Sequence, residues 1–330
     1  MSRMSISSSS ISNLECFLEC TTPTVSSQLL PKSCIRDLNS LWLPVEKEMV
    51  EYFTLRDLWD RYDEWSAYGA GVPIVLNSGE TVVQYYAPYL SAIQIYTSKS
   101  FTNLRNLREE SDVGEFESDS WSDDSESGKL SRSLSNNSSR GWDAASEDSC
   151  FDQEGFWPMR DRIGYVYAEY FEKCAPCGRI PLMDKINELS RTHPGLMSFK
   201  SFDISPASWM AVSWYPIYHI PMGRNVRDLS ACFLTYHTLS SSFQDNLPEG
   251  KEICSSEDGI GERKCEGESS SISLPPFGLA TYKVQGNLWI NPETTDHGRI
   301  ISLTSAADSW LKQLRVEHHH DYNYFSSRLM

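Results

Sequence analysis

The fold is decided by one stretch, FDISPASWMAVSWYPIYHIPMGRNVRDLSACFLTYHTLS, at residues 202–240. It holds two runs rich in aromatic and β-branched residues, at 209–220 and 229–239, and such runs favour β-strands. Between the runs lies PMGRN at 221–225, whose Pro, Gly and Asn are residue types that form turns. The stretch therefore predicts a β-hairpin at the centre of a folded domain.

An amphipathic helix is predicted before this hairpin, beginning after Thr54 and ending at Gly69. Thr54 is a suitable N-cap, and Asp57 stands three residues later, as in a capping box. The residues on one face of the helix are apolar and are predicted to enter the core: Leu55, Leu58, Trp59, Tyr62 and Trp65.

The remaining patterns predict short strands and two more helices. Strands are expected at 72–76, 81–86, 90–96, 163–171 and 277–290, with Pro88 interrupting the second run and Asn77-Ser78-Gly79 as a hairpin turn. Helices are expected at 182–191, after Pro181, and at 305–317, with Thr304 as N-cap. Neighbouring strands are joined by turns rather than helical crossovers. The predicted fold class is therefore α+β, with a mostly antiparallel sheet and about three flanking helices.

The net charge of −16 is concentrated in two polar segments. Residues 109–154 hold 14 acidic and 3 basic residues, and residues 245–268 hold 8 acidic and 3 basic residues. The rest of the chain is electroneutral. Such segments bury too little apolar surface to fold. We therefore predict a disordered N-terminus at 1–13 and one α+β domain at 14–326, interrupted by a disordered acidic insertion at 105–154 and an acidic linker at 243–273.

Charge and composition exclude several classes of protein. A neutral body with acidic segments has no basic footprint for nucleic acid. No apolar run is long enough to span a membrane. The nine cysteines are scattered and odd in number, and no secretory signal is visible, so a disulfide framework is not expected.

Five short motifs together resemble a plant family catalogued as domain of unknown function number 789. They are WSAYG at 65–69, QYYAPYL at 84–90, PASW at 206–209, WYPIY at 214–218 and ACFLT at 231–235. The resemblance covers roughly residues 14–326. It implies an intracellular plant protein, in the cytoplasm and/or nucleus, and it assigns no catalytic residues.

The central hairpin carries the residues of one possible catalytic or ligand-binding site. His219 and His237 lie on its two arms, and with Asp203, Asp228 or Arg224 they could form a general acid–base pair. The hairpin aromatics Trp209, Trp214, Tyr215 and Tyr218 could line the pocket. Alternatively, these are strand histidines and core aromatics, because no nucleophile motif accompanies them.

A second hypothesis concerns Cys174-Ala-Pro-Cys177. Two thiols at this spacing can share a metal ion or form a disulfide. Two further metal ligands and a parallel-sheet context are missing, so incidental cysteines are the alternative. The run His318–His320 is predicted to end the last helix, where three adjacent imidazoles cannot face one ion.

The acidic insertion carries two kinase-type patterns. Ser120 is followed three residues later by Asp123, and Ser135 is preceded by Arg132. A phosphate would add roughly −1.5 to −2 charge at either serine. The sequence thus favours a non-enzymatic interaction or regulatory module without a cofactor, with an unidentified protein partner reached through the insertion. The alternatives are a ligand-binding protein or enzyme at the hairpin and a metal or redox role at Cys174 and Cys177.

Overall fold

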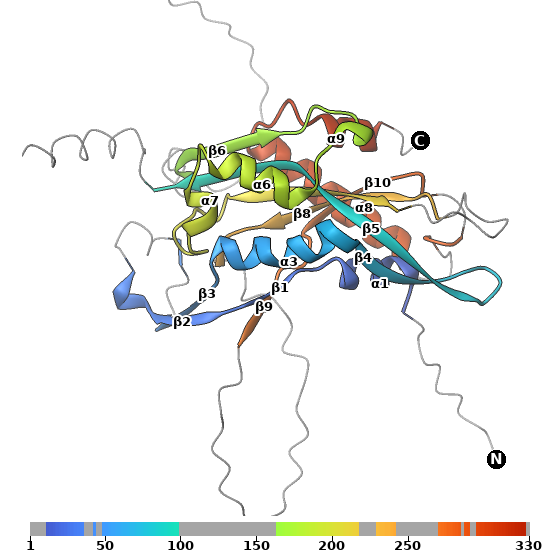
Figure 1. The fold of residues 1–330 in the computed structure, drawn as a ribbon, viewed down its shortest axis with the longest axis horizontal. Coiled ribbons are helices and arrows are strands. Elements are labelled where there is room, and N and C mark those ends of the chain that lie inside the picture. Colours follow the sequence, from blue (N-terminus) through green and yellow to red (C-terminus); the bar gives the residue numbers. More distant parts are fainter. Residues whose placement is uncertain are drawn as a thin grey trace, which may run out of the picture. The chain divides into compact units, whose positions relative to one another are not determined.

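The computed structural model describes residues 11–35, 42–43, 48–98, 163–217, 229–241, 270–284, 287–290 and 295–327 (Figure 1). These residues belong to one compact unit of the chain. The predicted acidic insertion at 105–154 lies outside the described residues. Most of the predicted linker at 243–273 also lies outside them, although its last residues form a short strand.

The centre of this unit is an antiparallel sheet with the strand order β10-β8-β7-β5-β4, in which β6 also pairs with β5 (Figure 1). Its strands are β4 (Ala70–Val75), β5 (Thr81–Thr97), β6 (Tyr165–Phe171), β7 (Trp209–Pro216), β8 (Cys232–Thr238) and β10 (Gly278–Tyr282). The two runs of the predicted hairpin, β7 and β8, pair antiparallel with Trp209 opposite Thr238. Together with the helices below, this confirms the predicted α+β class.

The longest strand, β5, contradicts the predicted break at Pro88. It runs unbroken from Thr81 to Thr97. On one side β4 pairs with it as far as Tyr86, and β6 begins to pair only at Ala92. Pro88 falls in the gap between these two partners, where β7 is its only neighbouring strand. A residue without an N–H is tolerated there because one side of the strand needs no ladder bond.

One face of the sheet, here called the α3 face, is covered by α3 (Leu55–Tyr68), α6 (Leu182–Ser190), α7 (Gly195–Ser198) and α1 (Asn13–Cys20). The predicted cap of α3 is confirmed. The Thr54 hydroxyl accepts the backbone N–H of Asp57, and the Asp57 carboxylate accepts the N–H of Thr54. Gly69 ends the helix with a φ of +80°, as a residue without Cβ readily does. The predicted apolar stripe is fully buried except for the edge of Trp65.

The opposite face, here called the α9 face, is covered by α9 (His320–Ser326) and by the second half of α8 (Asp296–Gln313), whereas Ile300 in the first half of α8 packs into the cluster of the α3 face. The helix predicted to start after Thr304 corresponds to α8. The predicted start is wrong, because α8 begins at Asp296 and Thr304 lies inside it. Sheet and helix approach closely at Gly278, where a Cβ would lie 2.9 Å from the Cβ of Ala307. The His318–His320 run does not end α8. His319 is instead the N-cap residue of α9.

The same unit contains two small antiparallel ribbons besides the central sheet. β1 (Thr24–Ser26) pairs with β9 (Ser271–Ser273), and β2 (Gln28–Pro31) pairs with β3 (Met49–Tyr52). The strand predicted at 277–290 is shorter than expected, because β10 ends at Tyr282. The remaining predicted elements, β6 and α6, are found close to their expected bounds. None of the described helices is long and apolar enough to cross a membrane.

Candidate functional site

His237, the described histidine of the predicted hairpin site, is fully buried in β8 on the α3 face. Its Nδ1 lies 2.9 Å from the carbonyl oxygen of Leu274, which can only accept, so Nδ1 carries the proton. Its Nε2 lies 2.9 Å from the Thr235 hydroxyl, which in turn accepts the indole N–H of Trp214. Burial lowers the pKa of His237 to about 4. Both ring nitrogens of this neutral side chain are therefore engaged in the core.

Of the other described members of the hairpin hypothesis, Trp214 alone is linked to His237, through the Thr235 hydroxyl. Trp209 and Tyr215 point to the α9 face, whereas Trp214 points to the α3 face. Asp203 lies in the turn before β7, where its carboxylate accepts the backbone N–H of Lys200 at 3.1 Å. Trp209 and Trp214 are fully buried.

The remaining members of that hypothesis, Tyr218, His219, Arg224 and Asp228, lie outside the described residues. Their roles stay predictions. The same holds for the two phosphorylation candidates, Ser120 and Ser135.

Cys174 and Cys177 are both exposed on the loop between β6 and α6, which contains a single 3₁₀ turn at Pro176–Gly178. The carboxylate of Glu172 accepts the backbone N–H of Cys174 and so fixes the start of the loop. Within the described ranges, no group of three or more His, Cys, Asp or Glu side chains is placed to hold a metal ion. A metal or redox role of the two thiols stays a prediction.

The end of the same loop carries a buried ion pair. Arg179 donates two parallel hydrogen bonds to the carboxylate of Asp321 in α9, at 2.6 and 2.8 Å, and the two side chains are 3% and 7% exposed. Burial lowers the pKa of Arg179, but the hydrogen bonds and charge of Asp321 outweigh burial and leave it raised. The hydroxyls of Ser91 and Ser213 and the carbonyl of Cys174 complete the polar contacts. The group is a structural tie between sheet, loop and α9.

His319 is the second buried histidine of the described chain, and it lies on the α9 face. It is 2% exposed, and its Nε2 has no hydrogen-bond partner among the described residues. Burial lowers its pKa to about 4. Four aromatic rings surround the imidazole at centroid distances of 5.8 to 6.3 Å: Phe171, Trp209, Tyr236 and Tyr322.

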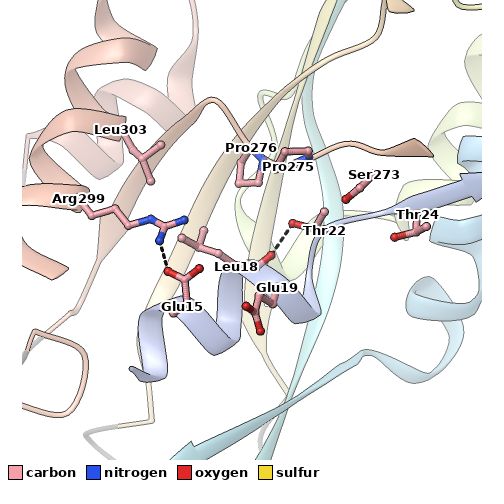
Figure 2. A pocket seen from close by; sticks show the side chains of 10 residues that line it. All are labelled: Glu15, Leu18, Glu19, Thr22, Thr24, Ser273, Pro275, Pro276, Arg299 and Leu303. Atoms are coloured by element: carbon pink, nitrogen blue, oxygen red, sulfur yellow. Dashed lines mark hydrogen bonds and ion pairs between the residues drawn. The ribbon is translucent and has the colours of Figure 1, made fainter. Parts of the chain in front are cut away.

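A cavity of about 280 Å³ opens at the surface between α1, α8 and the segments around β1 and β9. Figure 2 shows side chains of α1 facing Arg299 and Leu303 of α8, with two prolines above them. The lining combines apolar, hydroxyl and charged side chains: Glu15, Leu18, Glu19, Thr22, Thr24, Ser273, Pro275, Pro276, Arg299 and Leu303.

Side-chain contacts at the start of α1 fix this pocket. The Ser12 hydroxyl accepts the backbone N–H of Glu15 and donates to the carboxylate of Asp296, the first residue of α8. Asn13 bonds both backbone groups of Val75 in β4. Glu15 and Arg299 then form an ion pair across the pocket. The two helices are thus held one against the other at the pocket's edge.

The chemistry of the pocket is that of a binding site. Its lining offers two carboxylates, one guanidinium, several hydroxyls and aliphatic surface, and it contains no histidine or cysteine. Hydroxyls beside an arginine-paired carboxylate lack the activated nucleophile and oriented base that covalent catalysis needs. The lining can exclude water from an apolar group and hold a polar or charged head.

Residues 14–35 have no strong periodicity, so their pattern did not predict this pocket. A usable signal was present, since Ser12 followed by Glu15 and then by Phe17 and Leu18 matches the capping pattern before an apolar run. The other wall of the pocket was not predicted because α8 was expected to begin nine residues too late, at 305 rather than at 296.

The structure is thus that of an α+β protein with an antiparallel aromatic core and a small surface pocket. The family described as "Protein of unknown function (DUF789)" matches residues 12–325, and the chain belongs to this family. The resemblance found in the five sequence motifs is thereby confirmed. No curated protein and no solved structure matches the chain.

Proposed function

We propose that this protein is a non-enzymatic interaction module of the plant cell interior, cytoplasm and/or nucleus. Its folded body binds a protein partner, and its acidic segment at 109–154 is a phosphorylatable, partner-facing arm. The observation that carries the proposal is how the described titratable side chains are used. His237, Arg179 and Asp321 are buried and engaged in structural contacts, while the pocket is built for binding.

The arm is the regulatory part of the proposal. Ser120 and Ser135 stand in patterns that acid-directed and base-directed kinases accept. Phosphates would make an already acidic segment more negative and would add strong acceptors for arginine-rich partners.

The proposal is tested by quantitative affinity purification from plant cell extract. The full chain, a variant lacking residues 109–154, and a Ser120→Ala/Ser135→Ala variant are compared, with Ser138→Ala as the matched control. We expect the deletion to lose a defined subset of partners and the double variant to lose part of that subset. Identical partner sets for the full chain and the deletion would contradict the role of the arm.

Phosphorylation is measured separately by mass spectrometry of the full chain from the same extract. Phosphopeptides spanning Ser120 or Ser135 are expected. If the arm is recovered entirely unmodified, the regulatory part of the proposal fails while partner binding can still stand.

A further inference from the structure

The pocket between α1 and α8 has an aliphatic wall. Leu18 of α1 and Leu303 of α8 face the pocket beside Pro275 and Pro276 (Figure 2). Neither proline carries an N–H, so this part of the wall offers no backbone donor. A ligand group that packs against this part of the wall is therefore favoured if it is apolar.

The charges around the pocket are not balanced along its length. Arg299 is ion-paired with Glu15 at one end. Glu19 lies one turn further along α1, and its carboxylate makes no ion pair or hydrogen bond with the described residues, although its backbone carbonyl accepts the N–H of Thr22. The uncompensated charge of the pocket is thus one exposed carboxylate, which lies one helical turn from the Glu15 carboxylate that neutralises Arg299.

Two hydroxyl groups of the β1–β9 ribbon also line the pocket. Thr24 of β1 and Ser273 of β9 are directly opposed in the antiparallel ribbon, and both line the pocket. Within the described chain, neither hydroxyl makes a hydrogen bond. They can accept from a group that has several N–H donors.

We propose that this pocket receives a lysine side chain presented by an extended segment of a partner protein. This inference rests on the proposed function and names the partner's chemistry. A lysine stem packs its methylenes along apolar surface while its ammonium stays at a polar rim. Here the stem lies along Leu18, Leu303 and the prolines. The ammonium, with three donors, bonds Glu19 and a hydroxyl of the β1–β9 ribbon.

The test uses the full chain and three fluorescein-labelled heptapeptides, Ala-Pro-Ala-Xaa-Ala-Pro-Ala, with Xaa as lysine, norleucine or glutamate. Fluorescence anisotropy measures their binding. We expect the lysine peptide to bind about tenfold more tightly than the norleucine peptide, as one charge-assisted hydrogen bond implies. Its affinity should fall with added salt because the rim is exposed. Equal binding of the lysine and norleucine peptides would overturn the proposal.

Two variants identify the site. Glu19→Gln should weaken the lysine peptide about tenfold and leave the norleucine peptide unchanged. Glu80→Gln, an exposed carboxylate in the β4–β5 turn, is the matched control and should change neither. Leu303→Ala should weaken both peptides, with a thermal melt to confirm folding. An unchanged lysine affinity in Glu19→Gln would overturn the assignment.

Free cadaverine separates a peptide site from a site for small amines. It should fail to displace the lysine peptide at concentrations where the unlabelled peptide displaces it, and displacement by cadaverine at those concentrations would overturn the protein-partner part. The arm-deletion experiment has a separate readout. If that deletion removes partners but the lysine peptide does not bind, the pocket inference fails and the proposed function stands.

Discussion

The two faces of the central sheet each bury one histidine, and the two side chains differ in their hydrogen bonds. On the α3 face, both ring nitrogens of His237 are bonded in a neutral chain that runs from Trp214 through Thr235 to Leu274. On the α9 face, His319 is enclosed by aromatic rings, and its Nε2 lacks a partner among the described residues. The polar contacts of that face include the ion pair of Arg179 and Asp321 and the hydrogen bond that the indole N–H of Trp209 donates to Gln94.

The two faces are therefore sensitive to different kinds of substitution. The stability of a series of neutral hydrogen bonds depends on the fit of the side chains and on each donor having its acceptor. A buried ion pair depends on both charges being present, because either one alone is strongly disfavoured in the interior. The predictions below test this comparison.

The largest effect is expected at the ion pair. Arg179→Met leaves the carboxylate of Asp321 buried without its partner and should lower the free energy of unfolding by about 3–5 kcal/mol. Urea denaturation measures the loss. The double variant Arg179→Met/Asp321→Leu should recover most of it, because apolar residues can replace a buried pair.

The control for this prediction is Arg61→Met. Arg61 forms an exposed pair with Glu64 in α3, so its loss should cost less than about 1 kcal/mol. A similar loss for Arg61→Met and Arg179→Met would show that burial does not increase the contribution of the Arg179–Asp321 pair to the free energy of unfolding.

The two histidines should respond differently to the same substitution. His237→Phe leaves the carbonyl of Leu274 without its side-chain donor and removes the bond between Nε2 and the Thr235 hydroxyl, so it should cost about 1–3 kcal/mol. His319→Phe loses no bond at Nε2 and places a larger apolar ring among aromatic neighbours, so we expect a change within about 1 kcal/mol. Thermal and urea unfolding distinguish the two, and equal losses would remove the contrast between the faces.

A smaller, pH-dependent effect follows from the same two side chains. Burial lowers the pKa of each to about 4, below the value near 6.5 expected in the unfolded chain. The unfolded state therefore binds more protons between these values. The contribution of the two neutral histidines to the free energy of unfolding is fully present above pH 6.5 and is lost as the pH falls towards 4. The slope is at most about 1.4 kcal/mol per pH unit for each histidine.

Unfolding free energies at pH 7 and pH 5 measure this slope. Either His→Phe variant should lose less stability on acidification than the parent chain, because one protonation is removed. If acidification costs the variants and the parent the same free energy, the low pKa values are not the cause.

The smallest effect is expected at the exposed thiols. Cys174→Ser/Cys177→Ser should change the free energy of unfolding by less than about 0.5 kcal/mol, because both side chains lie at the surface. Metal content, measured by mass spectrometry of the purified chain, should also be unchanged. Stoichiometric zinc that disappears in the double variant would support the metal hypothesis instead.

Local signals predicted those parts of the fold that are decided locally. The Thr54–Asp57 cap, the buried stripe of α3 and the turn at Gly79, whose φ is +82°, depend on residues close in sequence. The paired runs of β7 and β8 are also close in sequence and strongly apolar.

Features decided by distant neighbours were not predictable in this way. Pro88 reads as a strand breaker, and only the gap between β4 and β6 shows why it is tolerated. The early start of α8 runs through Gly298, a poor helix former, and is supported by contacts of Asp296 and Arg299 with α1. The candidate pocket joins those two helices, so it could not be derived from either one alone.

The pairing of β5 with β6 has a consequence for how this chain can be engineered. Thr97 and Tyr165 are register partners at the end of that pair, so the chain leaves and re-enters the sheet at adjacent positions. Closing a connection between fixed neighbouring ends costs only about 0.6 kcal/mol for each doubling of its length. The junction is therefore a place where a reporter domain can replace residues 99–162 while the strands on either side keep their register.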